Sequence, residues 1–347
     1  MNPIIKEDAR VMANAELPWE ELYNKTVLIS GANGYVPAYF VHAFMARNDL
    51  NESNIRVIAL CRNEERAKKR FDGYLCRNDF TLIIQYVCDP INIDEDIHYF
   101  IHAASPAGLR IGNIDPLATF DANVTGCKNM LELCAKKNTK KFLFLSSIDA
   151  YGKIIPSKRF TETDCGVLDS MDPRNVYAIA KHASENLCVC HMAKHRTPVV
   201  VVRPSQIIGP GVALDDGRLH ADFISQMLRG GKIILKSDGS AKRTFLYITD
   251  AVTGMLAVML KGVPGEAYNV ADENGEATVL ELANLMASLA RGEKIEVAFD
   301  YNKRDSPEVT HALSEVTGDS NKLRSLGWRS RMTLKDGAER TMRYYGL

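Results

Sequence analysis

Short apolar runs alternate with longer amphipathic stretches through the first part of the chain, up to about residue 202. The runs are rich in β-branched residues, which is typical of buried parallel strands, and the stretches between them have the spacing of helices. We expect strands at 26–30, 55–60, 81–87, 99–102, 141–145 and 198–202. We expect one helix that follows the first strand and ends near Arg47, and two further helices at 119–137 and 176–194. This alternation predicts an α/β fold with a Rossmann-type doubly wound parallel sheet over residues 26–202.

The pattern becomes looser after residue 203. Helices are expected near 219–230, 249–261 and 278–291, and a loop rich in glycine and aspartate at 209–218. We expect residues 203–347 to form mainly a smaller C-terminal α/β cap that binds substrate, with some segments returning to the sheet. Residues 1–25 are mixed and polar, and they predict an N-terminal arm that packs through Trp19.

Composition and charge narrow the class of protein. The chain has 347 residues, of which 46% are hydrophobic, enough for one large or two unequal domains. Its 43 basic and 43 acidic residues cancel, so the charge balance favours neither nucleic acid nor an anionic membrane as a partner. No apolar run approaches the length of a membrane span. The eight cysteines lack the spacing of a zinc site, and without a signal peptide they predict reduced thiols in the cytoplasm and no bound metal.

A turn with two glycines, residues 31–37, connects the first expected strand to the helix that follows it. We call this segment the glycine turn. In this context Gly31 makes the tight turn, and Gly34 lets the backbone approach a pyrophosphate at the helix N-terminus. Pro37 occupies the position of a third glycine, and a proline is tolerated in the first turn of a helix. The turn therefore predicts a dinucleotide site, with a purely structural turn as the alternative. The candidate cofactor contacts in the turn are Gly31, Asn33, Gly34, Tyr35 and Val36.

The ends of the next three strands supply further candidate contacts for the cofactor. Arg62 follows the second strand, where an acidic residue would bind the ribose 2′-hydroxyl and an Arg pairs with a 2′-phosphate. The cofactor is therefore expected to be NAD or NADP, with NADP slightly favoured. Asp89 follows the third strand and is placed to meet the adenine amino group. The fourth strand ends in residues small enough to let a cofactor lie close, namely Ala103, Ala104 and Ser105.

Tyr177 and Lys181 stand four residues apart on an expected helix, so their side chains share one face. A free Tyr has a pKa of about 10, and a cation held beside the phenol lowers that pKa. The pair predicts a proton-transfer site for making or breaking a C–O–H bond. The alternative is a surface Tyr packed over a Lys stem. Ser147 and Asp149 follow the fifth strand, at the sheet edge where open parallel sheets bind ligands, so they are candidates for the same site.

Motifs over residues 26–330 together resemble the extended short-chain dehydrogenase/reductase family, which includes nucleotide-sugar epimerases, dehydratases and decarboxylases. The matching segments are the glycine turn, 102–104, 123–126, 146–152, the Tyr177/Lys181 pair, 203–210, 243–250, and the tail at 319–322 and 326–328. Segments 104–107 and 215–218 are most similar to those of UDP-glucuronate decarboxylases and their dehydratase relatives.

The resemblance implies a mechanism at the sugar C4 position. Tyr177 would remove the proton from the 4-hydroxyl while the hydride passes to the nicotinamide. Lys181 would lower the Tyr177 pKa and hold the nicotinamide ribose, and Ser147 would hydrogen-bond the same sugar oxygen. Asn123 lies in a family motif and would contact the cofactor. Helices 119–137 and 176–194 resemble those through which family members pair, which implies a homodimer.

The resemblance also implies that the substrate is a nucleotide-diphosphate sugar. Arg243 matches the Arg that grips the diphosphate, a task that suits a planar guanidinium. Gln206 replaces the usual Asn that faces the sugar and the diphosphate. The other candidate substrate contacts are Ser105, Ser147, Arg218 and Arg304, of which the two Arg would meet phosphate or uracil.

The sequence does not decide which step follows oxidation at C4. Asp149 stands where the decarboxylases and dehydratases carry Glu, whereas Ile148 lacks the second acid that the dehydratases use. The resemblance thus implies an epimerase or a decarboxylase, in which Asp149 either serves chemistry beyond C4 or is a polar strand-end residue. One alternative is an NADPH-dependent ketoreductase of the same family. Another is a non-catalytic dinucleotide sensor, which would not need Ser147, Tyr177 and Lys181 together.

Overall fold

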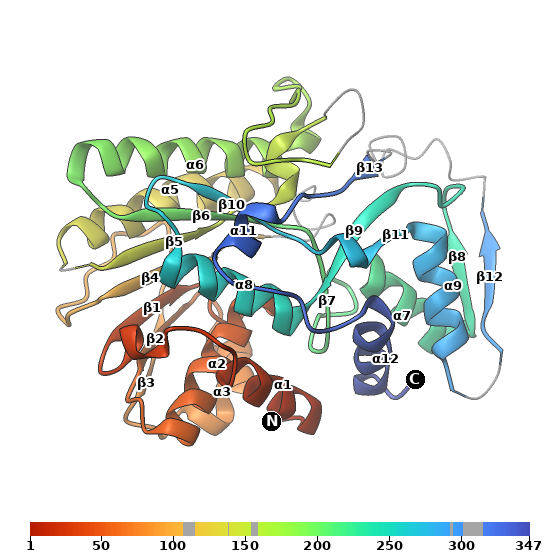
Figure 1. The fold of residues 1–347 in the computed structure, drawn as a ribbon, viewed down its shortest axis with the longest axis horizontal. Coiled ribbons are helices and arrows are strands. Elements are labelled where there is room, and N and C mark those ends of the chain that lie inside the picture. The colour runs from red at the N-terminus through yellow and green to blue at the C-terminus, as the bar shows by residue number, and fades with distance from the viewer. Residues whose placement is uncertain (107–114, 138, 154–158, 292–293, 301–314) are drawn as a thin grey trace.

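The computed structural model describes residues 1–106, 115–137, 139–153, 159–291, 294–300 and 315–347. Its centre is a sheet of seven strands in which every neighbouring pair is parallel (Figure 1). From one edge to the other the strands are β10 (Ala267–Val270), β6 (Val199–Pro204), β5 (Lys141–Leu145), β4 (Tyr99–His102), β1 (Thr26–Ser30), β2 (Arg56–Cys61) and β3 (Phe80–Ile84). This arrangement confirms the predicted Rossmann-type parallel sheet.

Helices cover both sides of the sheet (Figure 1). One side carries α1 (Pro3–Ala13), α2 (Tyr35–Asn51), α3 (Glu64–Phe71) and α8 (Ile248–Lys261), and the other carries α5 (Pro116–Ala135) and α6 (Val176–His195). Side chains alternate along β1, so that Val27 and Ile29 join the first hydrophobic core and Leu28 joins the second. All of β1 is buried, which explains why its sequence is a continuous apolar run rather than an alternating one.

A smaller unit of mixed strands and helices follows the sixth strand and lies beside the main sheet (Figure 1). One of its sheets is built from β7 (Gln206–Ile208), β9 (Lys242–Tyr247), β11 (Glu276–Thr278) and β13 (Glu315–Val316), and a second from β8 (Lys232–Leu235) and β12 (Glu296–Phe299). The helices of the C-terminal part besides α8 are α7 (Leu219–Gly230), α9 (Val279–Leu289), α11 (Asn321–Ser325) and α12 (Leu334–Tyr344). The described residues also form the 3-10 helices η1 (Trp19–Leu22), η2 (Asp72–Tyr74), η3 (Ile148–Tyr151), η4 (Pro173–Asn175) and η5 (Glu273–Gly275).

The N-terminal arm is part of the folded core. Trp19 is buried, its indole N–H donates to the Ala15 carbonyl at 3.0 Å, and its ring packs edge-on against Phe44 of α2. On α1, the buried Asp8 carboxylate accepts hydrogen bonds from the Tyr247 hydroxyl of β9 and from Arg340 of α12. The arm therefore packs against both α2 and the C-terminal unit.

Some elements differ from those that the sequence predicts. β3 ends at Ile84 rather than at residue 87, because the chain then turns, with the Asp89 N–H bonded to the Tyr86 carbonyl. β10 adds a seventh strand beside β6, and the segment 267–270 is too short to show a clear apolar pattern. α12 was not expected either, whereas the short strands of the C-terminal unit agree with the expected α/β character of this part of the chain. Within the described residues, no helix has both the length and the apolar character needed to cross a bilayer.

Candidate active site

The glycine turn between β1 and α2 lies close against the end of β4. Gly31 has φ +66°, and a Cβ at this position would lie 2.7 Å from the Cα of Ala104, so only glycine fits. Gly34 is the residue before α2, and its N–H donates to the Gly31 carbonyl at 2.8 Å. Asn33 and Val36 are partly exposed beside the turn. The first N–H groups of α2 have no partner within the helix, and such a helix end binds anions.

The end of β4 is held in place by the buried hydroxyl of Ser30. Its oxygen accepts the N–H groups of Ala103 and Ala104 at 3.2 and 3.3 Å, and it lies 2.7 Å from His102 Nδ1. These contacts fix the small residues of the β4 end against the glycine turn, where Ala103 and Ala104 remain partly exposed.

Asn123 of α5 connects the β4 end to the second helical layer. Its amide nitrogen donates to the Ser105 hydroxyl at 2.9 Å and to the Thr119 carbonyl at 2.7 Å. Its amide oxygen is buried and has no hydrogen-bond partner. A buried acceptor that lacks a partner within the protein can accept a hydrogen bond from a bound ligand. Together with the cradle at Gly31, it fits a bound dinucleotide.

The adenosine end of the expected cofactor site contains an aromatic residue that the sequence analysis missed. Arg62, which follows β2, is exposed, and its guanidinium carbon lies 5.7 Å from the ring centroid of Tyr86. Asp89, which we expected to meet adenine, lies five residues beyond the end of β3 and is exposed. The signal that would have found Tyr86 is an aromatic side chain two residues after a strand of the parallel sheet.

Tyr177 and Lys181 lie on the first two turns of α6, beside the end of β5. Lys181 is buried; its ammonium donates to the Leu145 carbonyl at 2.6 Å and lies 5.7 Å from the centroid of the Tyr177 ring. Burial lowers the pKa of Lys181 to about 8, so the ammonium form still dominates at neutral pH. The geometry therefore places a cation beside the phenol, as the spacing of the two residues predicts.

The expected lowering of the Tyr177 pKa by Lys181 is not found. The pKa of Tyr177 is raised to about 12, mainly by burial and also by the negative charge of Asp149, although a hydrogen bond to Ser147 and the charge of Arg218 oppose the rise. The Lys181 ammonium is directed to the Leu145 carbonyl instead of the phenol oxygen. In this state the phenol is the stable form, and a base at this position needs additional positive charge nearby.

Ser147 and Asp149 lie where β5 turns into η3. The Ser147 hydroxyl accepts the Asp149 N–H at 3.2 Å and donates to the Asp149 carboxylate at 3.0 Å. Burial raises the pKa of Asp149, and both this hydrogen bond and the charge of Arg243 on β9 oppose the rise. A hydroxyl, a carboxylate, a phenol and a guanidinium thus meet at the carboxyl end of β5, brought together from β5, α6 and β9.

Ile148 points away from this group. It is 2% exposed and packs in an apolar cluster with Tyr151, Phe160 and Val316. A carboxylate at position 148 would be buried among these side chains and would not reach the polar side of η3. The local turn therefore directs one acid, Asp149, into the site.

The remaining candidate substrate residues lie on the C-terminal unit. Arg218 pairs with Asp216 at 3.2 Å, and its guanidinium carbon lies 5.1 Å from the centroid of the Tyr35 ring, next to the glycine turn. Gln206 begins β7 and pairs in register with Phe245 of β9. Arg304 lies outside the described residues.

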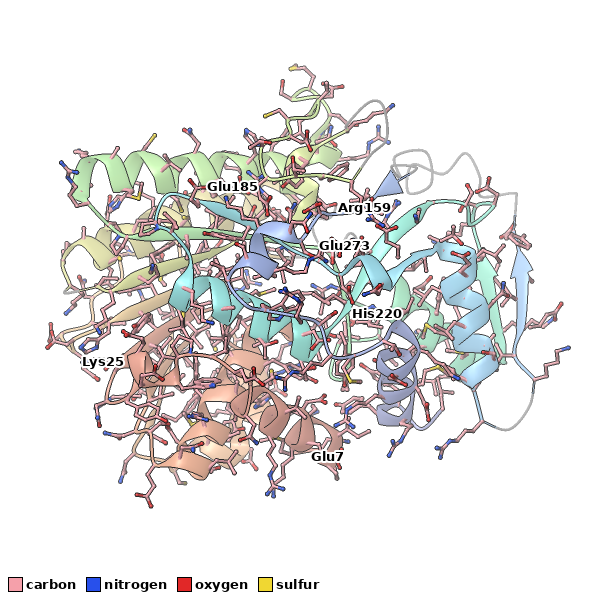
Figure 2. The ribbon with its side chains drawn as sticks, in the orientation of Figure 1. Glu7, Lys25, Arg159, Glu185, His220 and Glu273 are labelled. Carbon is pink, nitrogen blue, oxygen red and sulfur yellow. The ribbon has the colours of Figure 1, made fainter. Side chains whose placement is uncertain are left out.

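A buried ion pair behind the site was not identified as functional from the sequence. Glu185, on the side of α6 that faces the sheet (Figure 2), accepts two hydrogen bonds from Arg203 at 3.0 and 2.6 Å and one from the Ser146 hydroxyl. Arg203 also lies 4.5 Å over the ring of Tyr151. This network ties α6 to the ends of β5 and β6, and so fixes the position of Tyr177.

The described part of the chain holds no cluster of His, Cys, Asp and Glu that could bind a metal ion. All eight cysteines are free thiols. The sulfur atoms of Cys127 on α5 and Cys188 on α6 lie 3.7 Å apart.

Comparison with known proteins gives consistent matches. The sequence profile of the NAD dependent epimerase/dehydratase family matches residues 27–271. The chain is 28% identical to UDP-glucuronic acid decarboxylase 6 of Arabidopsis thaliana, over 90% of this chain and 87% of the relative. It is 25% identical to the dTDP-D-glucose 4,6-dehydratase of Homo sapiens, over 94% and 93% of the two chains. Its fold is similar to that of the UDP-glucuronic acid 4-epimerase of Bacillus cereus in complex with UDP-glucuronic acid and NAD, with a TM-score of 0.77 at 21% identity, over 92% and 99% of the chains.

Proposed function

This chain belongs to the NAD dependent epimerase/dehydratase family, and we propose that it oxidises the C4 hydroxyl of a nucleotide-diphosphate sugar and decarboxylates the sugar at the 4-keto stage. The observation that carries the proposal is the meeting of Ser147, Asp149, Tyr177 and Arg243 at the end of β5. The similarity to UDP-glucuronic acid decarboxylases supports a uronic acid as the sugar.

The first step is the removal of a proton from the sugar. The phenol oxygen of Tyr177, as phenolate, accepts the proton of the 4-hydroxyl, and the Ser147 hydroxyl holds the same sugar oxygen. The nicotinamide cofactor, when bound, accepts the hydride from C4 and returns it at the end. Lys181 lies 5.7 Å from the centroid of the Tyr177 ring, but its ammonium donates to the Leu145 carbonyl, so the phenolate that the step requires needs further positive charge, which the oxidised nicotinamide of a bound cofactor would supply.

The second step depends on the carboxyl group at C6. In a 4-keto uronic acid this carboxylate belongs to a β-keto acid, so the C5–C6 bond breaks to release carbon dioxide, and C5 then takes up a proton. Asp149 lies beside Ser147 and Tyr177 with a raised pKa, which suits a group that holds or transfers this proton. The charge of Arg243 acts on Asp149, and in this proposal its guanidinium binds the substrate phosphate.

Epimerisation at C4 is the second candidate, because it uses the same oxidation and needs no acid at position 149. The fold similarity to an epimerase is compatible with it. Dehydration with a pair of acids is not supported, since Ile148 packs into an apolar cluster on the other side of η3. A ketoreductase would instead consume one NADPH for each keto substrate that it reduces.

For the cofactor we propose NADP. Arg62 at the end of β2 offers a guanidinium to a 2′-phosphate where a carboxylate would otherwise bind a 2′-hydroxyl. We also propose that residues 26–202 form the cofactor-binding part and residues 203–347 mainly the substrate-binding part. The exposed apolar side chains of Leu117 and Phe120 on α5 and of Val189 on α6 support a homodimer that pairs through these helices.

The test is incubation of the purified enzyme with UDP-, dTDP-, CDP- and GDP-sugars, including the uronic acids, with products identified by mass spectrometry and NMR. A decarboxylase releases carbon dioxide and a pentose nucleotide without net consumption of cofactor. If the enzyme is a decarboxylase, its Asp149→Asn variant stalls after oxidation. If the enzyme is an epimerase, the same variant keeps most of its rate. Stoichiometric loss of NADPH with a keto substrate would instead identify a ketoreductase and overturn the proposal.

A further inference from the structure

Glu185 lies on α6 four residues after Lys181, and both side chains are buried. Residues four apart share one face of a helix. The Lys181 ammonium and the Glu185 carboxylate are therefore held in the same layer, between α6 and the ends of β5 and β6. Because water is largely excluded from this layer, the two charges interact more strongly than they would at the surface.

Lys181 and Glu185 hold two consecutive residues at the end of β5. The Lys181 ammonium donates to the Leu145 carbonyl at 2.6 Å, and the Ser146 hydroxyl donates to Glu185 Oε1 at 2.5 Å. The Leu145 carbonyl and the Ser146 N–H belong to one peptide group, and this N–H donates to the Val202 carbonyl of β6 at 2.8 Å. The peptide group that accepts the ammonium is thus held by β6 through its N–H and by Glu185 through the serine hydroxyl.

Arg203 fixes the Glu185 carboxylate from its other side. Its Nε and Nη2 groups donate to the two carboxylate oxygens at 3.0 and 2.6 Å, which is a bidentate pair. Its Nη1 group donates to the Glu162 carbonyl at 3.1 Å, and its guanidinium carbon lies 4.5 Å from the centroid of the Tyr151 ring. The carboxylate is therefore held in one position, and its charge acts on Lys181 from a constant direction.

Titratable groups from three elements act on the Lys181 ammonium or respond to its charge. They are Cys127 of α5, Tyr177, Glu185 and Cys188 of α6, and His102 of β4. Burial raises the pKa of Cys188 well above its usual range and lowers that of His102 to about 3, so neither is charged at neutral pH. Burial also lowers the pKa of Lys181 to about 8, and Cys127, Glu185 and Cys188 oppose this. Of these three, Glu185 is a carboxylate bound to a guanidinium, so its negative charge is present at neutral pH.

We propose that Glu185 is a positioning residue for Lys181: its carboxylate keeps the buried ammonium charged, and through Ser146 it fixes the carbonyl to which that ammonium is bound. This inference rests on the proposed function in one respect, that the charge of Lys181 assists the Tyr177 phenolate. Glu185 acts through Lys181, because its own hydrogen bonds go to Ser146 and Arg203. Without this carboxylate the buried lysine would be a neutral amine over part of the neutral pH range, and the phenolate would lose a nearby cation.

The test is a carbon-13 NMR titration of the full chain, labelled at the ε carbon of its lysines, from about pH 6 to about pH 10. The signal of Lys181 is identified as the one that Lys181→Met removes. Glu185→Gln keeps the shape of the side chain and an oxygen for Ser146 but removes the charge. The Lys181 midpoint, near pH 8 in the unmodified protein, should fall by about one pH unit or more. Glu132→Gln, which removes an exposed carboxylate of α5, is the matched control and should leave the midpoint unchanged.

A double variant separates the charge of Glu185 from its structural contribution. Glu185→Gln leaves the Arg203 guanidinium buried without its partner, and adding Arg203→Met should recover most of the melting temperature that is lost. The Lys181 midpoint of the double variant should lie between those of Glu185→Gln and the unmodified protein, because the repelling guanidinium is gone but the carboxylate is still absent. A double variant whose midpoint equals that of the unmodified protein would show that Glu185 acts through structure alone, and would overturn the proposal. An unchanged midpoint in Glu185→Gln would do the same.

Turnover provides a second measurement on the double variant. At about pH 8 its kcat should be about fivefold lower or less, whereas its KM for the nucleotide sugar should change less than about twofold, because Glu185 assists the base and not the binding of substrate. An unchanged kcat would contradict the proposal. Because the NMR titration contains no substrate, an enzyme that shows the expected midpoints but acts on no nucleotide sugar would refute the proposed function alone.

Discussion

Three buried histidines make the folded chain sensitive to mild acid. His42, His102 and His220 are at most 4% exposed. The pKa of each is lowered from 6.5 to about 3, mainly by burial and also by a neighbouring positive charge, that of Arg70, Lys181 and Arg218 respectively. The folded chain therefore keeps these rings neutral at a pH where the unfolded chain protonates them. Stability is fully present above pH 6.5 and is lost as the pH falls towards 3.

The expected loss is large compared with the stability of a typical domain. At about pH 5 each histidine lowers the free energy of unfolding by about 2 kcal/mol, so that the three together lower it by about 6 kcal/mol. Asp250 acts in the opposite direction, because burial raises its pKa to about 6 and its neutral form favours folding below that pH. This offsets about 1 kcal/mol, so these four groups together lower the free energy of unfolding by about 5 kcal/mol.

Equilibrium urea unfolding between about pH 7.5 and pH 5 measures this loss. His42→Phe keeps an aromatic ring among Tyr39, Phe71 and Tyr74 but removes the titrating group. The free energy of unfolding of this variant should fall less steeply as the pH is lowered. Near pH 5 its slope against pH should correspond to about one proton fewer taken up on unfolding than in the unmodified protein. His195→Gln, at an exposed position, is the control and should leave the slope unchanged. A stability that does not depend on pH in this range, or a slope that His42→Phe leaves unaltered, would refute the reasoning.

Three further substitutions test the site and the fold. Tyr177→Phe should lower turnover by about 100-fold or more at an unchanged melting temperature, and a variant that still turned over would exclude Tyr177 as the base. Gly31→Ala should abolish dinucleotide binding in calorimetry, whereas Gly73→Ala, with open space around it, should not; equal effects would show that the close approach at the turn is irrelevant. Arg340→Met leaves the carboxylate of Asp8 buried without its cation, and should cost about 3 kcal/mol in urea unfolding. Adding Asp8→Leu should recover most of that loss, and a double variant as unstable as the single one would contradict this account.

The sequence located the parts of the fold whose patterns are local. β1, β4 and β5 begin and end at the expected residues because each is a continuous apolar run flanked by polar or small residues. The glycine turn was equally clear, since a strand, two glycines and a helix in this order have few other structures. The spacing of Tyr177 and Lys181 likewise placed both side chains on one helix face at the end of β5.

What the sequence did not show depends on partners that are distant along the chain. β10 is a strand because β6 lies beside it, and its four residues carry no periodic signal of their own. The Tyr177 pKa depends on burial and on Asp149, neither of which follows from the spacing of Tyr177 and Lys181. Tyr86 became a candidate only when the turn after β3 placed it beside Arg62.

The loop that leads to Arg218 shows how the two halves of the site are joined. Three consecutive carbonyls, those of residues 210–212, accept hydrogen bonds from the side chains of Tyr39, Arg70 and Tyr345, at 3.1, 3.0 and 2.5 Å. Two of these donors lie on α2 and α3, next to the glycine turn and the end of β2, and the third lies at the C-terminus. The start of this loop is therefore positioned by α2 and α3 together with the C-terminal Tyr345. Because Arg218 then lies over Tyr35 of the glycine turn, the separation between the expected phosphate sites of cofactor and substrate is set by these contacts rather than by the length of the loop.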